Sequence, residues 1–171
     1  MRAVLVVLAF VFTLGVSGCG TTLGRPSCWR FARQDIQDVK LWLYLSGQGR
    51  TAVFRFSEAG VELFLGGWRG PCIGLEDAER ARWMELVSRV PKRFTALGEV
   101  GPRDEIIDIA APGRGRGTFL RLRELSIDET RSLEKFACLA IGAFGGPAVT
   151  AFKGAAPNFS ARARLPESCR G

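Results

Sequence analysis

The chain has 171 residues, 47% of them hydrophobic and 24% charged, a balance that excludes a disordered chain and suits one domain with a buried core. Histidine is absent, which excludes the commonest general base, the commonest metal ligand and every Ser–His or Cys–His nucleophile pair. The formal net charge is +7, supplied mostly by arginine, so the surface favours anionic lipid headgroups or an acidic protein partner.

The chain begins with the layout of a bacterial lipoprotein signal. Arg2 precedes an apolar run from Ala3 to Val16, and small residues then lead to Cys19. A basic start, an apolar middle and a small-residue cleavage site predict a signal peptide over residues 1–18, and Cys19 resembles the lipobox cysteine whose thiol is acylated. The apolar run is shorter than the about 20 residues needed to span a bilayer, so we favour cleavage over an uncleaved transmembrane helix.

Lipidation at Cys19 predicts where the mature chain resides. Residues 19–27 would form a lipidated tether and residues 28–171 a single periplasm-facing domain, whose net charge is 7 − 1 = +6 because Arg2 is removed. Each buried methylene contributes roughly 0.8 kcal/mol, so two or more acyl chains anchor a protein stably. Gly20 in place of an aspartate favours the outer membrane, or the plasma membrane if the host has only one. Nucleic acid is not an expected partner of a lipoprotein in this location.

Four cysteines follow the lipobox cysteine, and no Cys-x-x-Cys spacing indicates a zinc or thioredoxin-type site. An even number of thiols in an oxidising compartment predicts two disulfides. Of the three possible connectivities, we favour Cys28–Cys169, which would tie the two chain ends together, with Cys72–Cys138. Buried free thiols are the alternative.

Strand patterns dominate the first half of the domain. Val39–Leu45 and Thr51–Phe56 alternate apolar residues on one face, Ser46–Arg50 is a turn between them, and Val61–Leu65 is a further apolar run. Short loops join these segments, which predicts an antiparallel meander. Leu75–Val90 predicts a helix, because its apolar residues share one face and a proline follows it.

The second half combines two strand patterns, one segment that fits either a helix or a strand, and a closing strand pattern. Glu105–Ala110 and Thr118–Leu125 predict strands. Ser126–Phe144 fits a capping box followed by a helical stripe, yet its end, Ala137–Phe144, fits a buried strand equally well, and periodicity does not decide for short apolar runs. Phe159–Leu165 alternates apolar and polar residues and predicts an edge strand.

The sequence contains few candidate catalytic or ligand-binding residues. Asp104, Glu105 and Asp108 form the one tight carboxylate group outside the predicted helix, and paired acids can do general acid–base work, but charges bordering a strand are usually solvated. The glycine-rich loop that follows lacks the strand–loop–helix context of a phosphate-binding loop. Its Arg114 and Arg116 are candidates for contact with an anionic headgroup or an acidic partner. We therefore predict no catalytic residue, no metal site and no cofactor.

The lipobox and the strand pattern together resemble the small outer-membrane lipoprotein of the type VI secretion membrane complex, the TssJ type. The resemblance is carried by the lipobox cysteine with its tether, Val39–Leu45, Thr51–Phe56, Glu105–Gly113 with its Pro-Gly turn, Leu139–Phe144, and Phe159–Leu165 as the closing strand. It implies a mainly β fold, an antiparallel two-layer β-sandwich of transthyretin type with one or two added helices. The alternative is α+β, with helices on one face of an antiparallel sheet. A helix at Ala137–Phe144 would favour that alternative and remove most of the resemblance.

The sequence thus predicts a non-enzymatic outer-membrane lipoprotein that serves as a structural or interaction component of an envelope complex. The resemblance implies type VI secretion, with an inner-membrane component as the protein partner. The bilayer is the other expected partner, through acylated Cys19. The alternatives are a lipoprotein whose basic surface binds anionic glycolipid or peptidoglycan, and an uncharacterised lipoprotein. An enzyme is the least favoured class, because no acid–base constellation accompanies the lack of histidine.

Overall fold

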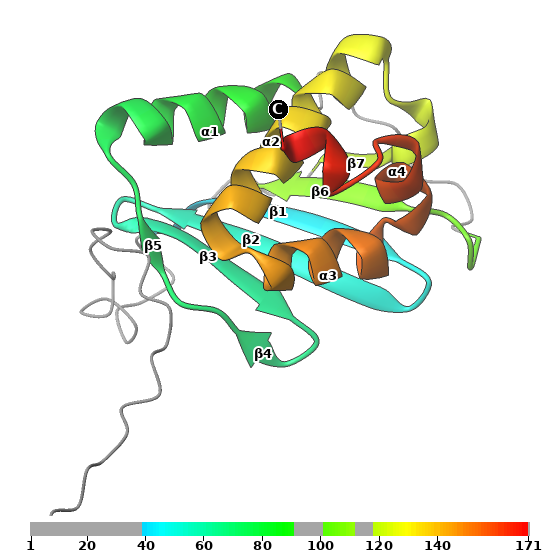
Figure 1. Cartoon of the computed structure of the whole chain (residues 1–171), viewed down its shortest axis with the longest axis horizontal. Coiled ribbons are helices and arrows are strands. Elements are labelled where there is room, and N and C mark those ends of the chain that lie inside the picture. Colours follow the sequence, from blue (N-terminus) through cyan, green and yellow to red (C-terminus); the bar gives the residue numbers. More distant parts are fainter. Residues whose placement is uncertain (1–38, 91–100, 112–117, 171) are drawn as a thin grey trace, which may run out of the picture.

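The computed structural model describes residues 39–90, 101–111 and 118–170. In this part of the chain, an antiparallel sheet of seven strands lies against a layer of helices (Figure 1). The strands are β1 (Val39–Gly47), β2 (Arg50–Ser57), β3 (Gly60–Leu65), β4 (Trp68–Arg69), β5 (Ile73–Gly74), β6 (Ile106–Ala110) and β7 (Thr118–Arg121). The helices are α1 (Asp77–Arg89), α2 (Ile127–Phe144), α3 (Gly146–Ala155) and α4 (Pro157–Arg162), with short 3-10 turns η3 (Leu122–Glu124) and η4 (Glu167–Cys169).

The strand β1 lies in the middle of the sheet, which has the order β4-β3-β2-β1-β6-β7, and β5 pairs with the start of β3. The first three strands form the predicted meander. The turn between β1 and β2 is Gln48-Gly49, with φ of 49° and 71°, as expected where a two-residue turn must follow the twist of its strands. Strands predicted after residues 104 and 117 are also confirmed, although the second is shorter than predicted because η3 follows it.

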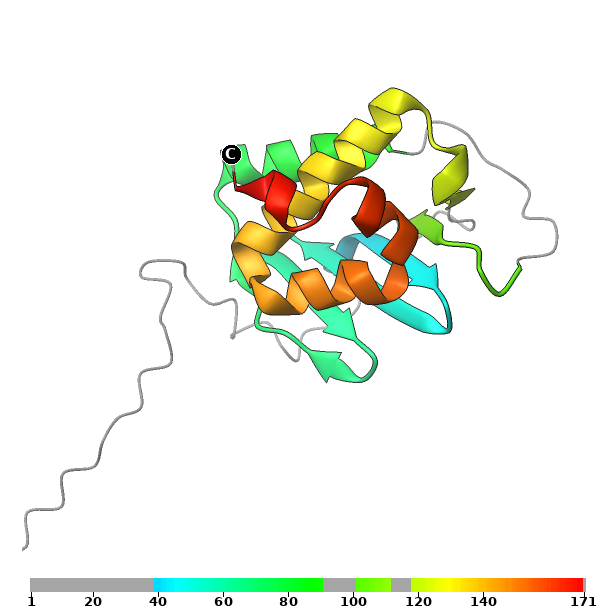
Figure 2. The same cartoon turned by 45° about the vertical axis from the view of Figure 1, so that its right-hand side comes forward.

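All four helices lie on one side of the sheet (Figure 2). Phe54 of β2 is central to the core, with the rings of Phe136 from α2 and Phe152 from α3 at 5.1 and 5.8 Å between centroids. Trp83 of α1 packs on Phe56 of β2 at 5.8 Å. These rings are almost fully buried. The core is therefore the aromatic layer between one sheet face and the helices.

This is the second of the two predicted arrangements, α+β with helices on one face of an antiparallel sheet. The facing sheet that a β-sandwich requires is not formed by residues 39–90, 101–111 and 118–170, where the facing layer is helical. Two segments expected to supply strands for the sandwich fold as helices, for local reasons given below.

The helix α2 includes the ambiguous segment Ala137–Phe144, so the strand interpretation of that segment is wrong. The predicted capping box is formed: the N–H of Glu129 donates to Oγ of Ser126 at 3.2 Å, and the N–H of Ser126 donates to the Glu129 carboxylate at 2.7 Å. These bonds satisfy N–H groups that a helix start leaves open. From Leu133 to Phe144, the buried residues of α2 then recur at helical spacing.

The predicted edge strand over Phe159–Leu165 is also wrong, because Pro157–Arg162 form α4 and a turn follows. Proline at the first helical position loses no hydrogen bond. The carboxylate of Glu105, on the β6 side, accepts hydrogen bonds from the N–H groups of Asn158 and Phe159 and caps this helix. Apolar alternation over such a short segment did not reveal that cap, since its acceptor comes from a distant part of the chain.

A disulfide joins Cys138 of α2 to Cys169 of η4, which are 31 residues apart. The predicted pairings Cys28–Cys169 and Cys72–Cys138 are therefore wrong. The chain turns back after α4 and packs η4 against α2 (Figure 2), which brings Cys169 next to Cys138 although α3 and α4 lie between them in sequence.

Several predictions fall outside the described residues: the signal peptide over 1–18, the tether over 19–27 and the lipidation of Cys19, together with the loop arginines Arg114 and Arg116. They stay predictions, as does the assignment of residues 28–171 to one domain. None of the helices in the described ranges combines the length and the apolar character that a membrane span requires.

Candidate functional site

The sheet face opposite the helices carries aromatic and charged side chains. We call it the helix-free face, and it consists of Trp42 and Tyr44 of β1, Val53 and Arg55 of β2, Glu62 and Phe64 of β3, and Asp108 of β6. These residues alternate with core residues of the same strands, because successive side chains of a strand point to opposite faces. All are partly buried except Glu62, which is only 5% exposed. In the described part of the chain, no helix lies on this face (Figure 2).

Glu62 is held between two arginines. Its carboxylate pairs with Arg55 and with Arg69 of β4, where the N–O distance is 2.7 Å. The guanidinium of Arg55 lies 5.8 Å from the ring centroid of Trp42 and 5.4 Å from that of Phe64. Burial and the charge of Arg69 lower the pKa of Arg55. Arg55 thus interacts with two aromatic rings and with the carboxylate of Glu62. The charge of Glu62 is neutralised by arginines of the same chain.

Tyr44 and Asp108 are direct partners across β1 and β6. Burial raises the pKa of the Asp108 carboxyl, and burial together with the charge of Asp108 raises the pKa of Tyr44. Oδ1 of Asp108 is buried and has no hydrogen-bond partner. Leaving such an oxygen unsatisfied is costly. Among the described residues of the helix-free face, two groups therefore have unused hydrogen-bonding capacity: this acceptor oxygen of Asp108 and the Nε–H donor of Arg55.

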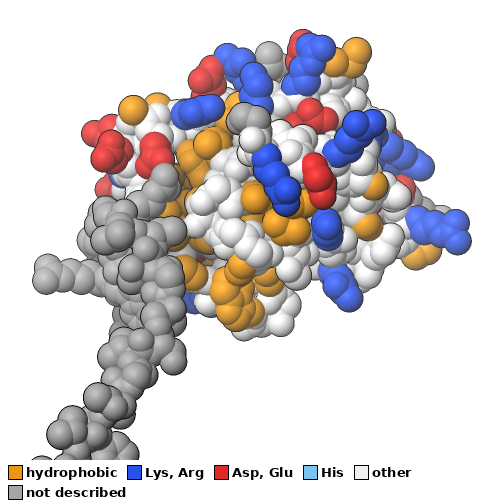
Figure 3. Space-filling view, in the orientation of Figure 1, with side chains coloured by type: hydrophobic (Ala, Val, Ile, Leu, Met, Phe, Trp, Pro, Cys, Tyr) orange, Lys and Arg blue, Asp and Glu red, His pale blue; other side chains and the backbone are white. Residues whose placement is uncertain are grey.

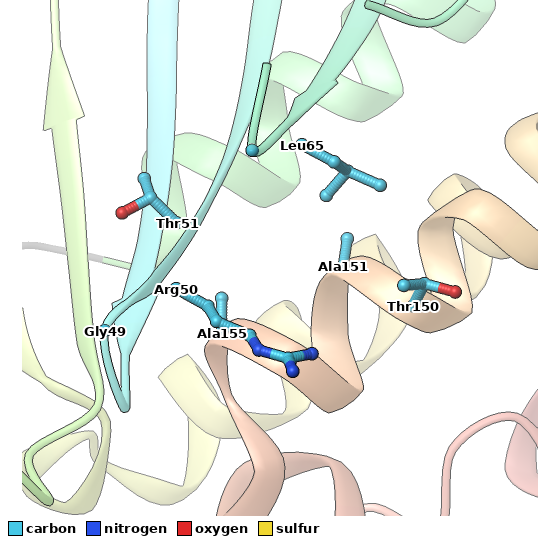
Figure 4. Close-up of a pocket in the computed structure, with 9 residues that line it drawn as sticks. Gly49, Arg50, Thr51, Leu65, Thr150, Ala151 and Ala155 are labelled. Carbon is cyan, nitrogen blue, oxygen red and sulfur yellow. The ribbon is translucent and has the colours of Figure 1, made fainter. Parts of the chain in front are cut away.

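A groove of about 490 Å³ lies on the helical side, between the β1–β2 turn, the end of β3 and α3 (Figure 4). The side chain of Arg50 extends along it toward α3, and Gly154 leaves room for this, since a Cβ there would lie 3.3 Å from Cδ of Arg50. Leu65 and Ala151 supply apolar walls and Thr150 a hydroxyl group. A groove that combines one positive charge with apolar residues suits a ligand in which an anionic group is attached to an apolar chain.

The predicted carboxylate group is separated by the fold. Asp104 lies 3.2 Å from a guanidinium nitrogen of Arg121 and 3.4 Å from one of Arg123. A hydrogen bond from the N–H of Gly101, aided by the charges of these two arginines, lowers the pKa of Asp104. This carboxylate is thus an ionised partner of arginine, not a proton donor.

The other two members of that group have separate environments. Glu105 caps α4 on the helical side, whereas Asp108 belongs to the helix-free face. The three acids therefore do not form an acid–base pair. Within residues 39–90, 101–111 and 118–170, no three acidic or cysteine side chains come together as candidate metal ligands.

Lysine and arginine side chains are spread over the helical face, where acidic side chains lie among them (Figure 3). The predicted contact residues Arg114 and Arg116 are outside the described ranges. Comparisons with protein-family models, curated proteins and solved structures give no match to this chain. Its function is therefore inferred from its own motifs and geometry.

The helix-free face was not among the predicted sites, although part of its signal is visible in the sequence. The alternation of β2 places Val53 and Arg55 opposite the core residue Phe54, so a charged second face was predictable. The clamp on Glu62 was not, because this residue lies in an apolar run and Arg69 comes from a strand of two residues.

Proposed function

We propose that this protein is a lipid-anchored, non-catalytic component of the bacterial envelope that binds a partner protein through the helix-free face. The lipobox ending at Cys19 supports the anchor. The Cys138–Cys169 disulfide supports an oxidising compartment, in agreement with a periplasm-facing domain. The proposed location is the outer membrane, or the plasma membrane in a host with a single membrane.

The unsatisfied oxygen of Asp108 is the observation that carries the partner-binding part. It lies beside Tyr44, and the aromatic rings of Trp42 and Phe64 belong to the same face. Aromatic side chains are enriched in the cores of protein interfaces. An arginine or lysine of the partner would supply a charge-assisted hydrogen bond to the carboxylate. The partner is accordingly an envelope protein that presents a basic side chain.

The geometry favours no particular secretion system. Leu139–Phe144 and Phe159–Leu165, which carried part of the resemblance to the type VI lipoprotein, are helical or turn segments in this structure. What remains of that resemblance is the lipobox and the strands β1, β2 and β6. A role in an envelope complex needs only the anchor and a binding face.

Photo-crosslinking in cells tests the proposal. A photoreactive residue at Phe64 should crosslink to a discrete envelope protein, and one at exposed Lys135 on α2 should not. Asp108→Lys should abolish the crosslink, because it places a second cation where the partner's cation binds, while Asp108→Glu should retain it. Equal crosslinking from both positions, or a crosslink unaffected by Asp108→Lys, would contradict the proposal.

The groove at Arg50 favours one second candidate, the binding of anionic glycolipid or peptidoglycan fragments. Arg50 is its charged lining residue, and Leu65 and Ala151 line its apolar part. Binding of an anionic lipid fragment that weakens with salt and is lost in Arg50→Ala would support this candidate. Binding that is unchanged in Arg50→Ala would exclude this groove as the binding site.

A further inference from the structure

We propose that Cys72 forms a disulfide with Cys28, and that this bridge shortens the lipid tether. The inference rests on the proposed acylation of Cys19. Cys72 is disulfide-bonded, while Cys138 and Cys169 are bonded to each other. The chain has five cysteines, so the partner of Cys72 is Cys19 or Cys28. Lipidation consumes the thiol of Cys19, which leaves Cys28.

The sheet geometry allows this pairing. Cys72 directly precedes β5, which pairs with the start of β3 at Val61. The first residue of β1, Val39, pairs with Ser57 at the end of β2, and a tight turn joins β2 to β3 at that same end of the sheet. Neighbouring strands lie about 4.8 Å apart, so the three steps from β1 to β5 cover roughly 15 Å. The 39 − 28 = 11 residues from Cys28 to Val39 reach at most about 40 Å, which is more than enough.

The bridge changes how far the domain extends from the bilayer. With it, the tether is the 28 − 19 = 9 residues from Cys19 to Cys28, which span at most about 32 Å. Without it, the first described residue, Val39, is 39 − 19 = 20 residues from Cys19, a span of at most about 70 Å. The attachment point moves to the β5 side of the sheet, opposite α4 and β7 (Figure 1). The disulfide therefore determines how far the domain can lie from the bilayer and where on the domain the tether is attached.

The chemistry is an ordinary thiol oxidation. The two thiols lose two protons and two electrons as the S–S bond forms, and the disulfide of an envelope thiol oxidoreductase accepts the electrons and is reduced to a dithiol. The oxidant is the same class of enzyme that the Cys138–Cys169 bridge already requires.

Thiol labelling of the full acylated protein, denatured without reductant, tests the pairing. The wild-type chain should not react with a maleimide. Cys28→Ala should expose one thiol per chain, on the tryptic peptide Gly70–Arg80 that contains Cys72. The matched variant Cys138→Ala should instead expose a thiol on the peptide Leu165–Arg170. A reactive Cys72 in the wild type, or a blocked one in Cys28→Ala, would overturn the pairing.

The same experiment separates this inference from the proposed function. A peptide that links Cys72 to Cys19 would remove both the acylation and the inference. An acylated Cys19 together with a free Cys72 would remove the inference alone, because the anchor would stand.

Energy transfer measures the predicted reach. A dye on an unnatural residue at exposed Lys153 donates to acceptor lipids in vesicles that carry the acylated protein. Transfer should be lower in Cys28→Ser/Cys72→Ser than in the wild type, since the longer tether lets the domain move away. The control Cys138→Ser/Cys169→Ser should keep the wild-type value. Equal transfer in all three proteins would overturn the effect on reach.

Discussion

The carboxylate of Glu105 accepts a hydrogen bond of 3.0 Å from the backbone N–H of Phe159, 54 residues further along the chain. It also accepts one from the neighbouring N–H of Asn158. The side chain is 7% exposed, so these bonds are shielded from water. An acid that sequence analysis placed in a candidate catalytic group is thus a structural cap that joins the β6 side of the sheet to α4.

Glu105→Gln should lower the free energy of unfolding by about 1.5–3 kcal/mol, the range for a hydrogen bond to a charged group. The amide keeps one acceptor oxygen but turns an NH₂ group toward an N–H donor. Urea unfolding measures the effect, with exposed Glu167→Gln as the control, which should stay within about 0.5 kcal/mol of the wild type. A Glu105→Gln protein as stable as this control would show that the cap contributes little.

Asp108→Asn should change the pH dependence of stability. Because the folded pKa of Asp108 is raised, ionisation opposes folding, and stability falls as the pH rises from the ordinary value of 3.8 through the raised pKa. Asparagine does not ionise, so the variant lacks this loss. The free energy of unfolding of the variant minus that of the wild type should therefore be larger at pH 7 than at pH 3. Unfolding at a series of pH values measures it.

Asp104→Asn should change the pH dependence of stability in the opposite direction. The folded pKa of Asp104 is lowered, so its stabilisation is present above the ordinary value of 3.8 and is lost as the pH falls through the lowered pKa. The variant should be less stable than the wild type at pH 7, and the difference should shrink on acidification. The assigned environments would be wrong if Asp108→Asn gained no stability relative to the wild type between pH 3 and pH 7, or if the Asp104→Asn difference did not shrink on acidification.

The double variant Cys138→Ser/Cys169→Ser should lose about 2–4 kcal/mol, because the open chain gains conformational freedom on unfolding. Urea unfolding of both proteins without reductant measures the loss. The lost contact also frees η4 from α2, so proteolysis should begin at the C-terminal turn. A variant with wild-type stability and the same cleavage pattern would contradict a structural role for this bridge.

Two glycine substitutions should have opposite effects. A Cβ at Gly47 would lie 2.6 Å from the carbonyl oxygen of Ala155, so Gly47→Ala must displace the β1–β2 turn from α3 and should cost about 1–3 kcal/mol. At Gly142 in α2 a Cβ meets open space, so Gly142→Ala should stabilise by about 0.5–1 kcal/mol. Thermal unfolding of both variants checks the packing; equal shifts would contradict it.

The accuracy of the sequence predictions follows how local each signal is. The strands β1 to β3 were predictable because alternation and tight turns are encoded within each hairpin, and the Ser126–Glu129 box marks the start of α2 within four residues. The cap of α4 and the Cys138–Cys169 bridge depend on contacts between distant segments. The role of Asp108 was missed for the same reason, since it depends on its place opposite Tyr44 in the sheet.

The mass of the mature amino terminus tests the central claim most directly. We predict a chain that begins at Cys19 and carries covalent lipid, and a Cys19→Ser variant that is not lipidated and leaves the membrane fraction. A wild-type protein that keeps residues 1–18, or that carries an unmodified cysteine at position 19, would contradict the lipid-anchored role.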